Sequence, residues 1–157
     1  MGSHPQITLS NGLLSALWQP AGLHLRRISY GGMEALCGVY FAVRDKNWGT
    51  VAPRISKQVL SKAGGGWRCD LELEWREGEI AIEGALRVHS PSPEKLIFSF
   101  HGVAQRDFKS NRIGFLILHG ARCAGKPVLV QSPDGSLRKG RFPDSISPHQ
   151  PFMNVSS

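Results

Sequence analysis

The stretch that most constrains the fold is residues 69–76, where apolar and charged side chains alternate without a break. The apolar set is Cys69, Leu71, Leu73 and Trp75, and the charged set is Asp70, Glu72, Glu74 and Arg76. Alternation with a period of two places the two sets on opposite faces of a strand. The stretch therefore predicts a half-buried antiparallel strand. Glu77-Gly78 then leads into a second apolar alternation from Ile80 to Val88, so we predict a hairpin.

The rest of the chain favours the same fold class. Helical periodicity is weak, and 18 glycines and 10 prolines separate short apolar runs. This pattern is typical of a sandwich or barrel of short strands. We predict an all-β fold, an antiparallel β-sandwich, as a single domain over residues 1–157. Residues 1–10 are expected to form a disordered N-terminus and residues 143–157 an extended tail.

A polar cluster follows the apolar run at residues 39–43. It contains Arg44, Asp45, Asn47 and Trp48. One interpretation is a sheet rim that contacts a ligand or a partner domain, with Trp48 as a stacking platform. The other is a strand-end turn in which Asp45 and Asn47 cap their own backbone and Trp48 covers the core. The residues taken alone favour the second interpretation.

Residues 113–118 are apolar on both faces of the strand they predict, which indicates a central strand covered on both sides. Arg112 and His119 flank this strand. Because residues seven apart on a regular strand point to opposite faces, the two are not expected to share one site. Arg112 is instead expected to form an ion pair, with Asp45 or Asp107 as candidate acceptors.

The remaining chemistry of the sequence argues against several functional classes. Glu72 and Glu74 share a strand face, but carboxylates two apart are more often solvated than catalytic. No histidine has metal-ligand spacing with another histidine or a cysteine, so we expect neither a metal nor a cofactor. No nucleotide-binding or hydrolase motif is present, and no nucleophile, base and orienting group can be assigned. The catalytic residues are therefore unknown at this point.

Charge and cysteine usage bear on partners and localisation. The net charge is +7, which makes nucleic acid a partner to consider. The basic residues are scattered, however, so the pattern disfavours a nucleic-acid binder. Three widely spaced cysteines indicate reduced thiols rather than a disulfide framework. No signal peptide or membrane-spanning run is visible, so we expect a cytoplasmic protein without membrane contact.

Five segments together resemble the N-terminal β-sandwich domain of the D-apionate lactonase family. They are LRRISYGGMEALCGVYFAVRDKNWGTVAPRIS (25–56), EGALRV (83–88), FKSNRIGFLILH (108–119), AGKPV (124–128) and GRFPDSISPHQPF (140–152). The resemblance implies a sandwich like those of galactose mutarotases. It also implies a hydrolase of carbohydrate metabolism that opens a lactone of a branched pentose acid. Full-length members are expected to continue into a (β/α)-barrel and a further β domain.

The resemblance therefore predicts an N-terminal accessory domain that docks on, or borders, a barrel absent from this chain. The chain alone is then not expected to be catalytic. The expected rim or interface residues are Arg44, Asp45, Asn47, Trp48, Arg112, His119 and His149. An alternative is a stand-alone carbohydrate-binding module for a sugar acid or lactone, with Trp48, Trp67 or Trp75 as the stacking surface. An exposed docking face would also favour a homodimer.

Overall fold

The computed structural model describes residues 6–63 and 65–145, and nearly all of its regular structure is β-strand. The contacts divide the chain after Leu118 into two compact units. The first contains β1 (Ile7–Asn11), β2 (Leu14–Gln19), the 3-10 turn η1 (Pro20–Gly22), β3 (His24–Tyr30), β4 (Met33–Asp45), β5 (Thr50–Val51), β6 (Arg54–Ala63), β7 (Gly66–Glu77), β8 (Ile80–Ser92), β9 (Lys95–Ala104) and β10 (Ser110–Leu118). The second contains the 3-10 turn η2 (Ala121–Cys123), β11 (Pro127–Gln131) and β12 (Leu137–Arg141).

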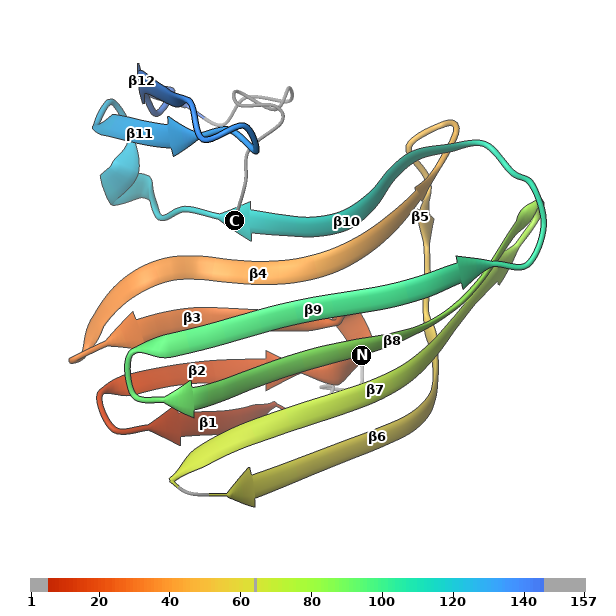
Figure 1. Ribbon diagram of the computed structural model, residues 1–157, viewed down its shortest axis with the longest axis horizontal. Coiled ribbons are helices and arrows are strands. Elements are labelled where there is room, and N and C mark those ends of the chain that lie inside the picture. Colours follow the sequence, from red (N-terminus) through yellow and green to blue (C-terminus); the bar gives the residue numbers. More distant parts are fainter. Residues whose placement is uncertain (1–5, 64, 146–157) are drawn as a thin grey trace. The chain divides into compact units, whose positions relative to one another are not determined.

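The first unit is a sandwich of two antiparallel sheets (Figure 1). One sheet has the order β1-β2-β3-β4-β10, with β5 paired to β4, and the other has the order β6-β7-β8-β9. Apolar side chains from both sheets form one core. The predicted all-β sandwich is thus confirmed.

The hairpin predicted from the alternation is formed by β7 and β8. Cys69, Leu71, Leu73 and Trp75 are all at most 2% exposed, and the two strands pair from Trp67↔Ser90 to Glu77↔Ile80. The core-facing set of β7 is therefore the one that the sequence indicated. The charged set lies on the outer face, where neighbouring strands supply its partners.

The glycine pair at residues 31 and 32 turns β3 into β4. Tyr30 pairs with Met33, so the connection is a two-residue turn. Both glycines have positive φ, 57° and 81°, as the tight hairpin turn between right-twisted strands requires. After this turn β4 runs without a break to Asp45, and it thereby carries the polar cluster to the end of the sheet.

One local expectation is corrected. The stretch expected to be a disordered N-terminus includes β1, which pairs with β2 along its whole length. Strand β8 also continues through Pro91 as far as Ser92. Its pairing with β9 shifts register between His89 and Ser92, because proline has no N–H to donate to the ladder. The strand thus passes through the proline with an irregularity instead of ending before it.

The expectation of a central, doubly covered strand at residues 113–118 is wrong. This segment is β10, and it pairs with β4 at the end of the sheet order. Ile113 and Ile117 are 40% and 56% exposed. An apolar run indicates burial on both faces only when another layer extends over it, and the second sheet does not cover β10.

One buried polar contact crosses the core between the sheets. The side-chain amide of Asn11 on β1 donates to the backbone oxygen and to Oγ of Ser90 on β8, at 3.1 and 3.0 Å. Both residues are buried, so the paired hydrogen bonds offset the cost of removing these groups from water. The contact fixes β1 against β8.

The second unit contains a small hairpin of β11 and β12. Its turn is closed by Ser132 N–H donating to Ser136 O, at 2.9 Å, and the sequence Ser-Pro-Asp-Gly at this point is typical of a turn. Among the described hydrophobic residues of this unit only Val130 is buried, and Leu129 and Leu137 are about 60% exposed, at 58% and 61%. None of the helices in the described part of the chain is long and apolar enough to cross a membrane.

Candidate functional site

The rim, defined as Arg44, Asp45, Asn47, Trp48 and Arg112, lies where β4 ends and β10 begins. Arg44 pairs with Arg112 across the two strands, and the register shifts between Ser110 and Arg112. The intervening Asn111 donates from Nδ2 to the backbone oxygen of Lys46, at 3.1 Å. Segments 65 residues apart in sequence thus meet at one edge of the sheet.

Asp45 builds the loop of the rim. Its Oδ1 accepts the backbone N–H groups of Asn47 and Gly49, at 2.8 and 2.7 Å, and its own N–H donates to Gly49 O, at 2.9 Å. A side chain on Gly49 would bring Cβ within 2.5 Å of the Asp45 carboxylate. The capping role expected for Asp45 is therefore confirmed, and it requires a glycine at position 49.

Trp48 is held out from the sheet rather than over the core. Its φ is 68°, a left-handed conformation that non-glycine residues seldom adopt, and it is 55% exposed. The interpretation of Trp48 as a core lid is therefore wrong. Backbone strain of this kind persists only where the surroundings enforce it, and here the Asp45 loop does so.

The Arg112 guanidinium lies over the exposed indole. Its Cζ is 5.5 Å from the centre of the Trp48 ring, which is within cation–π range. Arg44 meanwhile donates from Nη1 to Oγ1 of Thr50. The rim thus presents a cation over an exposed indole, a combination suited to a sugar face, a carboxylate or a polar protein surface.

A shallow hollow of about 280 Å³ adjoins the rim loop. Asp45, Lys46 and Asn47 form one side, and the turn after β7 and Lys109 form the other. Arg106 fixes that turn by donating to the backbone oxygens of Glu79 and Gly78, at 2.9 and 2.8 Å. The hollow therefore lies between two walls held by hydrogen bonds, and its lining combines charged side chains with the apolar Val51 and Ile80.

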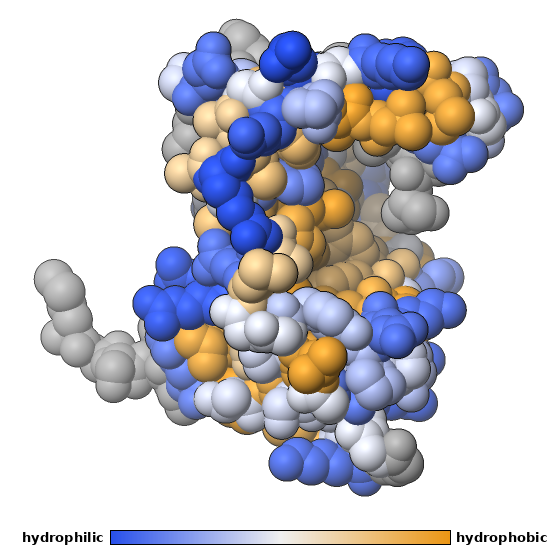
Figure 2. Space-filling view, turned by 90° about the vertical axis from the view of Figure 1, so that its left-hand side faces the viewer, coloured by the Kyte–Doolittle hydropathy of each residue, from blue (hydrophilic) through white to orange (hydrophobic). Residues whose placement is uncertain are grey.

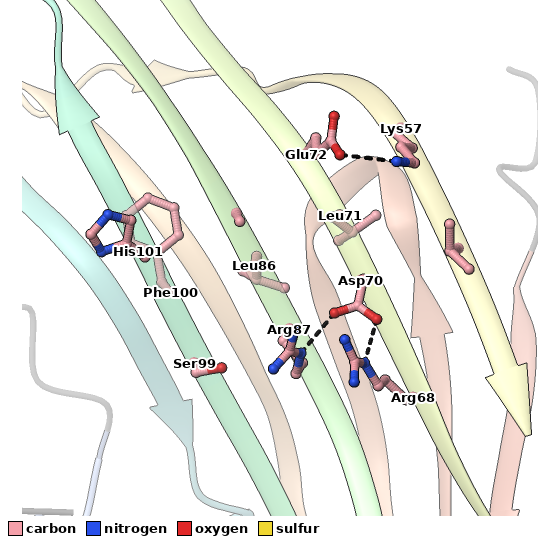
Figure 3. Close-up of a pocket in the computed structure, with 12 residues that line it drawn as sticks. Lys57, Arg68, Asp70, Leu71, Glu72, Leu86, Arg87, Ser99, Phe100 and His101 are labelled. Carbon is pink, nitrogen blue, oxygen red and sulfur yellow. Dashed lines mark hydrogen bonds and ion pairs between the residues drawn. The ribbon is translucent and has the colours of Figure 1, made fainter. Parts of the chain in front are cut away.

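A larger hollow of about 540 Å³ lies on the outer face of the β6–β9 sheet (Figure 3). There Asp70 accepts hydrogen bonds from Nε of Arg68 and Nε of Arg87, at 2.5 and 2.7 Å. The hydrogen bond from Arg68 is the main cause that lowers the pKa of Asp70 below its ordinary value. Lys57 and Glu72 form a further pair, at 3.2 Å.

The larger hollow is an exposed ladder of ion pairs. Its carboxylates are paired with cations, and its phenyl group, Phe100, packs against Phe41 and Trp75 on the opposite face of the sheet. Apart from the imidazole of His101, the face offers no ring on which a sugar could stack. Exposed cross-strand pairs of this kind contribute little each, so we assign the candidate function to the rim.

The structure brings together five of the seven predicted site residues. His119 belongs to the second unit, where its ring lies 4.6 Å from that of Phe142 and burial lowers its pKa. His149 lies outside the described residues. Within the described ranges, no group of three or more histidine, cysteine, aspartate or glutamate residues is arranged to hold a metal ion.

Sequence reasoning missed Asn111 and Thr50, which hydrogen-bond to Lys46 and Arg44 beside the rim, because these partners are set by strand pairing. It also named two stacking candidates that the structure rejects. Trp67 and Trp75 are 3% and 1% exposed, since both are in the core-facing set of β7. Of the chain's four tryptophans, all within the described ranges, Trp48 alone is exposed.

Comparison with known proteins identifies a family and a curated relative that match most of the chain. The profile of a family described as D-apionate lactonase, N-terminal domain, matches residues 2–157. A curated protein from Brucella anthropi, D-apionate lactonase, is 34% identical over 135 residues, which cover 84% of this chain. The chain spans only 22% of the length of that relative. No solved structure matches the chain.

Proposed function

The chain belongs to the D-apionate lactonase N-terminal domain family, and on this premise we propose that it is an accessory domain of a lactone-hydrolysing enzyme. Its rim docks on the catalytic part of the enzyme or borders the mouth of the active site. In the longer proteins this part is the (β/α)-barrel that the family resemblance implies. The substrate would be a lactone of a branched pentose acid, in cytoplasmic carbohydrate catabolism.

The observation that carries the proposal is the strained, exposed Trp48 beneath Arg112. An indole that contributes little to its own core, yet is held in a left-handed backbone conformation, favours a role outside the domain. Tryptophan and arginine are also the residues that most often dominate the energetics of protein interfaces. The 22% share of the relative's length leaves room there for the surface that the rim would meet.

A chimera tests the docking role. The matching N-terminal part of the Brucella anthropi relative is replaced by this chain, and hydrolysis of the lactone is measured together with thermal stability. We expect Trp48→Ala and Arg112→Ala each to lower the rate of lactone hydrolysis by the chimera about tenfold or more, or to lower its melting temperature, as loss of an interface anchor would. Leu13→Ala, at a 58% exposed residue away from the rim, is the matched control.

Rim variants that behave like the control would overturn the docking role. The isolated chain supplies the second arm of the test. It is expected not to hydrolyse the lactone above the spontaneous rate, and clear turnover by this chain alone would contradict an accessory role. Circular dichroism of each variant shows whether it is folded, so that a loss of activity is not mistaken for an effect on docking when the variant has unfolded.

The alternative, a stand-alone carbohydrate-binding module, rests on the exposed indole of Trp48. Aromatic rings present a flat apolar surface to sugars, and the Arg112 cation could hold the carboxylate of a sugar acid. Isothermal titration of the isolated chain with pentose acids and their lactones separates the two functions. Binding that disappears in Trp48→Ala would favour the module and remove the support for pure docking.

A further inference from the structure

The core-facing side of β10 is not covered. Ile113, Phe115 and Ile117 pair with Val43, Phe41 and Val39 of β4. The three β4 residues are buried, at 0%, 5% and 4% exposed, whereas their β10 neighbours on the same face are 40%, 37% and 56% exposed. The apolar face of the sheet therefore extends one strand farther than the layer that packs on it. Figure 2 shows that hydrophobic residues (orange) are part of the molecular surface, among hydrophilic ones (blue).

The other sheet ends beside this strand. β9 is the last strand of its sheet, and its core-facing residues Leu96, Phe98 and Phe100 are only partly buried. Phe98 and Phe115 meet edge to face, with ring centres 5.8 Å apart. The sandwich is thus open along one side, where the terminal strands of both sheets lie together near their midpoints.

The open side lacks the usual protection of strand edges. Proteins discourage edge-to-edge pairing with charged residues, especially lysine, and with proline. The edge strand β6 carries Arg54, Lys57 and Lys62, but β10 has neither charge nor proline from Ile113 to Leu118. On β9 the segment from Leu96 to Ala104 holds only His101 as a titratable group. This side of the first unit is therefore suited to accept further strands.

We propose that the open side joins two copies of this chain. A two-fold axis perpendicular to the sheets, passing near Phe98 and Phe115, would set β10 antiparallel to β10 of the second copy and β9 antiparallel to its β9. Centred on Phe115, this register places Ile113 of each copy opposite Ile117 of the other. Both sheets would continue across the dimer, and the exposed apolar face would become a continuous core.

The contact area suffices for a reversible dimer. Nine residues of β10 span about 30 Å at about 3.4 Å per residue, and sheets about 10 Å apart with their side chains give a depth of about 20 Å. The face is therefore on the order of 600 Å² per copy, near the lower limit for specific interfaces. We expect dissociation in the micromolar range or weaker, governed by concentration.

Charge makes the dimer dependent on salt. Each copy carries a net charge of +7, and the two copies repel each other at long range. Because salt screens this repulsion over about 10 Å at 0.1 M and leaves apolar burial intact, added salt should strengthen the association. A contact held by ion pairs would weaken instead.

Sedimentation velocity tests the proposal on the unaltered chain and on two variants. The wild type should shift from monomer to dimer between micromolar and submillimolar concentrations, and more completely in high salt. Ile117→Lys should raise the dissociation constant of the dimer about tenfold or more, because it buries a charge in the contact between the two copies. Leu13→Lys adds the same charge at a 58% exposed residue elsewhere and should leave the dimer intact.

Hydrogen exchange of the wild type supplies a readout that needs no variant. Amides of β10 and β9 should exchange more slowly as the concentration rises, whereas those of β6 should not change. A monomer at every concentration, or a dimer that Ile117→Lys leaves untouched, would overturn the proposal. The proposal does not depend on the function of the rim, which Trp48→Ala tests separately.

Discussion

At the scale of single residues, the rim shows how one side chain determines the presentation of another. The Asp45 carboxylate accepts hydrogen bonds from two backbone N–H groups and so fixes the loop that displays Trp48. Gly49 is needed because any Cβ there would collide with that carboxylate. A left-handed backbone costs a non-glycine residue about 1–2 kcal/mol. The loop therefore keeps an exposed tryptophan at a measurable cost in stability.

Cys69 offers a residue-scale prediction on pH. Burial, with a smaller contribution from the adjacent Asp70, raises the pKa of the Cys69 thiol to about 11. In the unfolded chain a thiol ionises near pH 8.5. Between these two values the unfolded state releases the proton and the folded state retains it. The free energy of unfolding should therefore fall as pH rises through this window.

Urea unfolding of the wild type and of Cys69→Ala, measured from pH 8 to 11, checks the effect. Lysines and tyrosines titrate in both proteins, so the difference between the two slopes isolates the thiol. We expect the wild type to lose on the order of 2 kcal/mol more than the variant across the window. Parallel slopes would contradict the assignment, as would alkylation of native Cys69 as fast as of the half-buried Cys37.

At the scale of elements, β8 and β9 pair at two facing glycines, and an aromatic ring packs over both. Gly84 pairs with Gly102, and the Phe100 ring lies over both. A Cβ on Gly84 would approach the ring to 2.7 Å, and one on Gly102 would approach it to 2.5 Å. The same ring lies 4.1 Å from Phe41 on the facing sheet. Because neither glycine has a side chain, the Phe100 ring can pack over its own sheet and still contact the facing sheet.

This arrangement predicts that Gly84→Ala destabilises the first unit by about 1–3 kcal/mol, the usual cost of overpacking. In a protein that also carries Phe100→Ala, Gly84→Ala should lower the free energy of unfolding distinctly less, because the ring that the added Cβ would clash with is absent. A remainder is expected from the His101 carbonyl, 2.8 Å from the added Cβ. Gly22→Ala, where the nearest atom is 3.7 Å away, is the control in chemical denaturation. Strictly additive costs would refute the coupling.

The elements also show what the sequence could reveal about the fold and the site. The alternation in β7 and the Gly31-Gly32 turn follow from rules that act between near neighbours, so both were predictable. The position of β10 was not, because an apolar run does not tell whether the facing sheet extends over it. The contact of Arg112 with Trp48 likewise depends on pairing between β4 and β10, which no local pattern encodes.

At the scale of the whole molecule, the two units differ sharply in what holds them. The first encloses three buried tryptophans, Trp18, Trp67 and Trp75, in a core shared by both sheets. The second, over its described residues, rests on a two-stranded hairpin with Val130 as its buried hydrophobic side chain. Backbone contacts such as Phe142 N–H to Lys126 O, at 2.9 Å, tie the ends of that hairpin. A two-stranded hairpin alone is marginally stable in water.

Hydrogen exchange should therefore separate the two units. Amides of β11 and β12 are expected to exchange by local opening, about a hundredfold or more faster than those of β7 and β8, which open only with the global transition. Mild denaturant should accelerate exchange in β7 and β8 and leave the hairpin rates nearly unchanged, because little surface is exposed when the hairpin opens. Peptides from the same digest provide the internal comparison. Equal protection of both hairpins would mean that the second unit is stabilised by contacts beyond its own strands, and the chain would then unfold as one cooperative body.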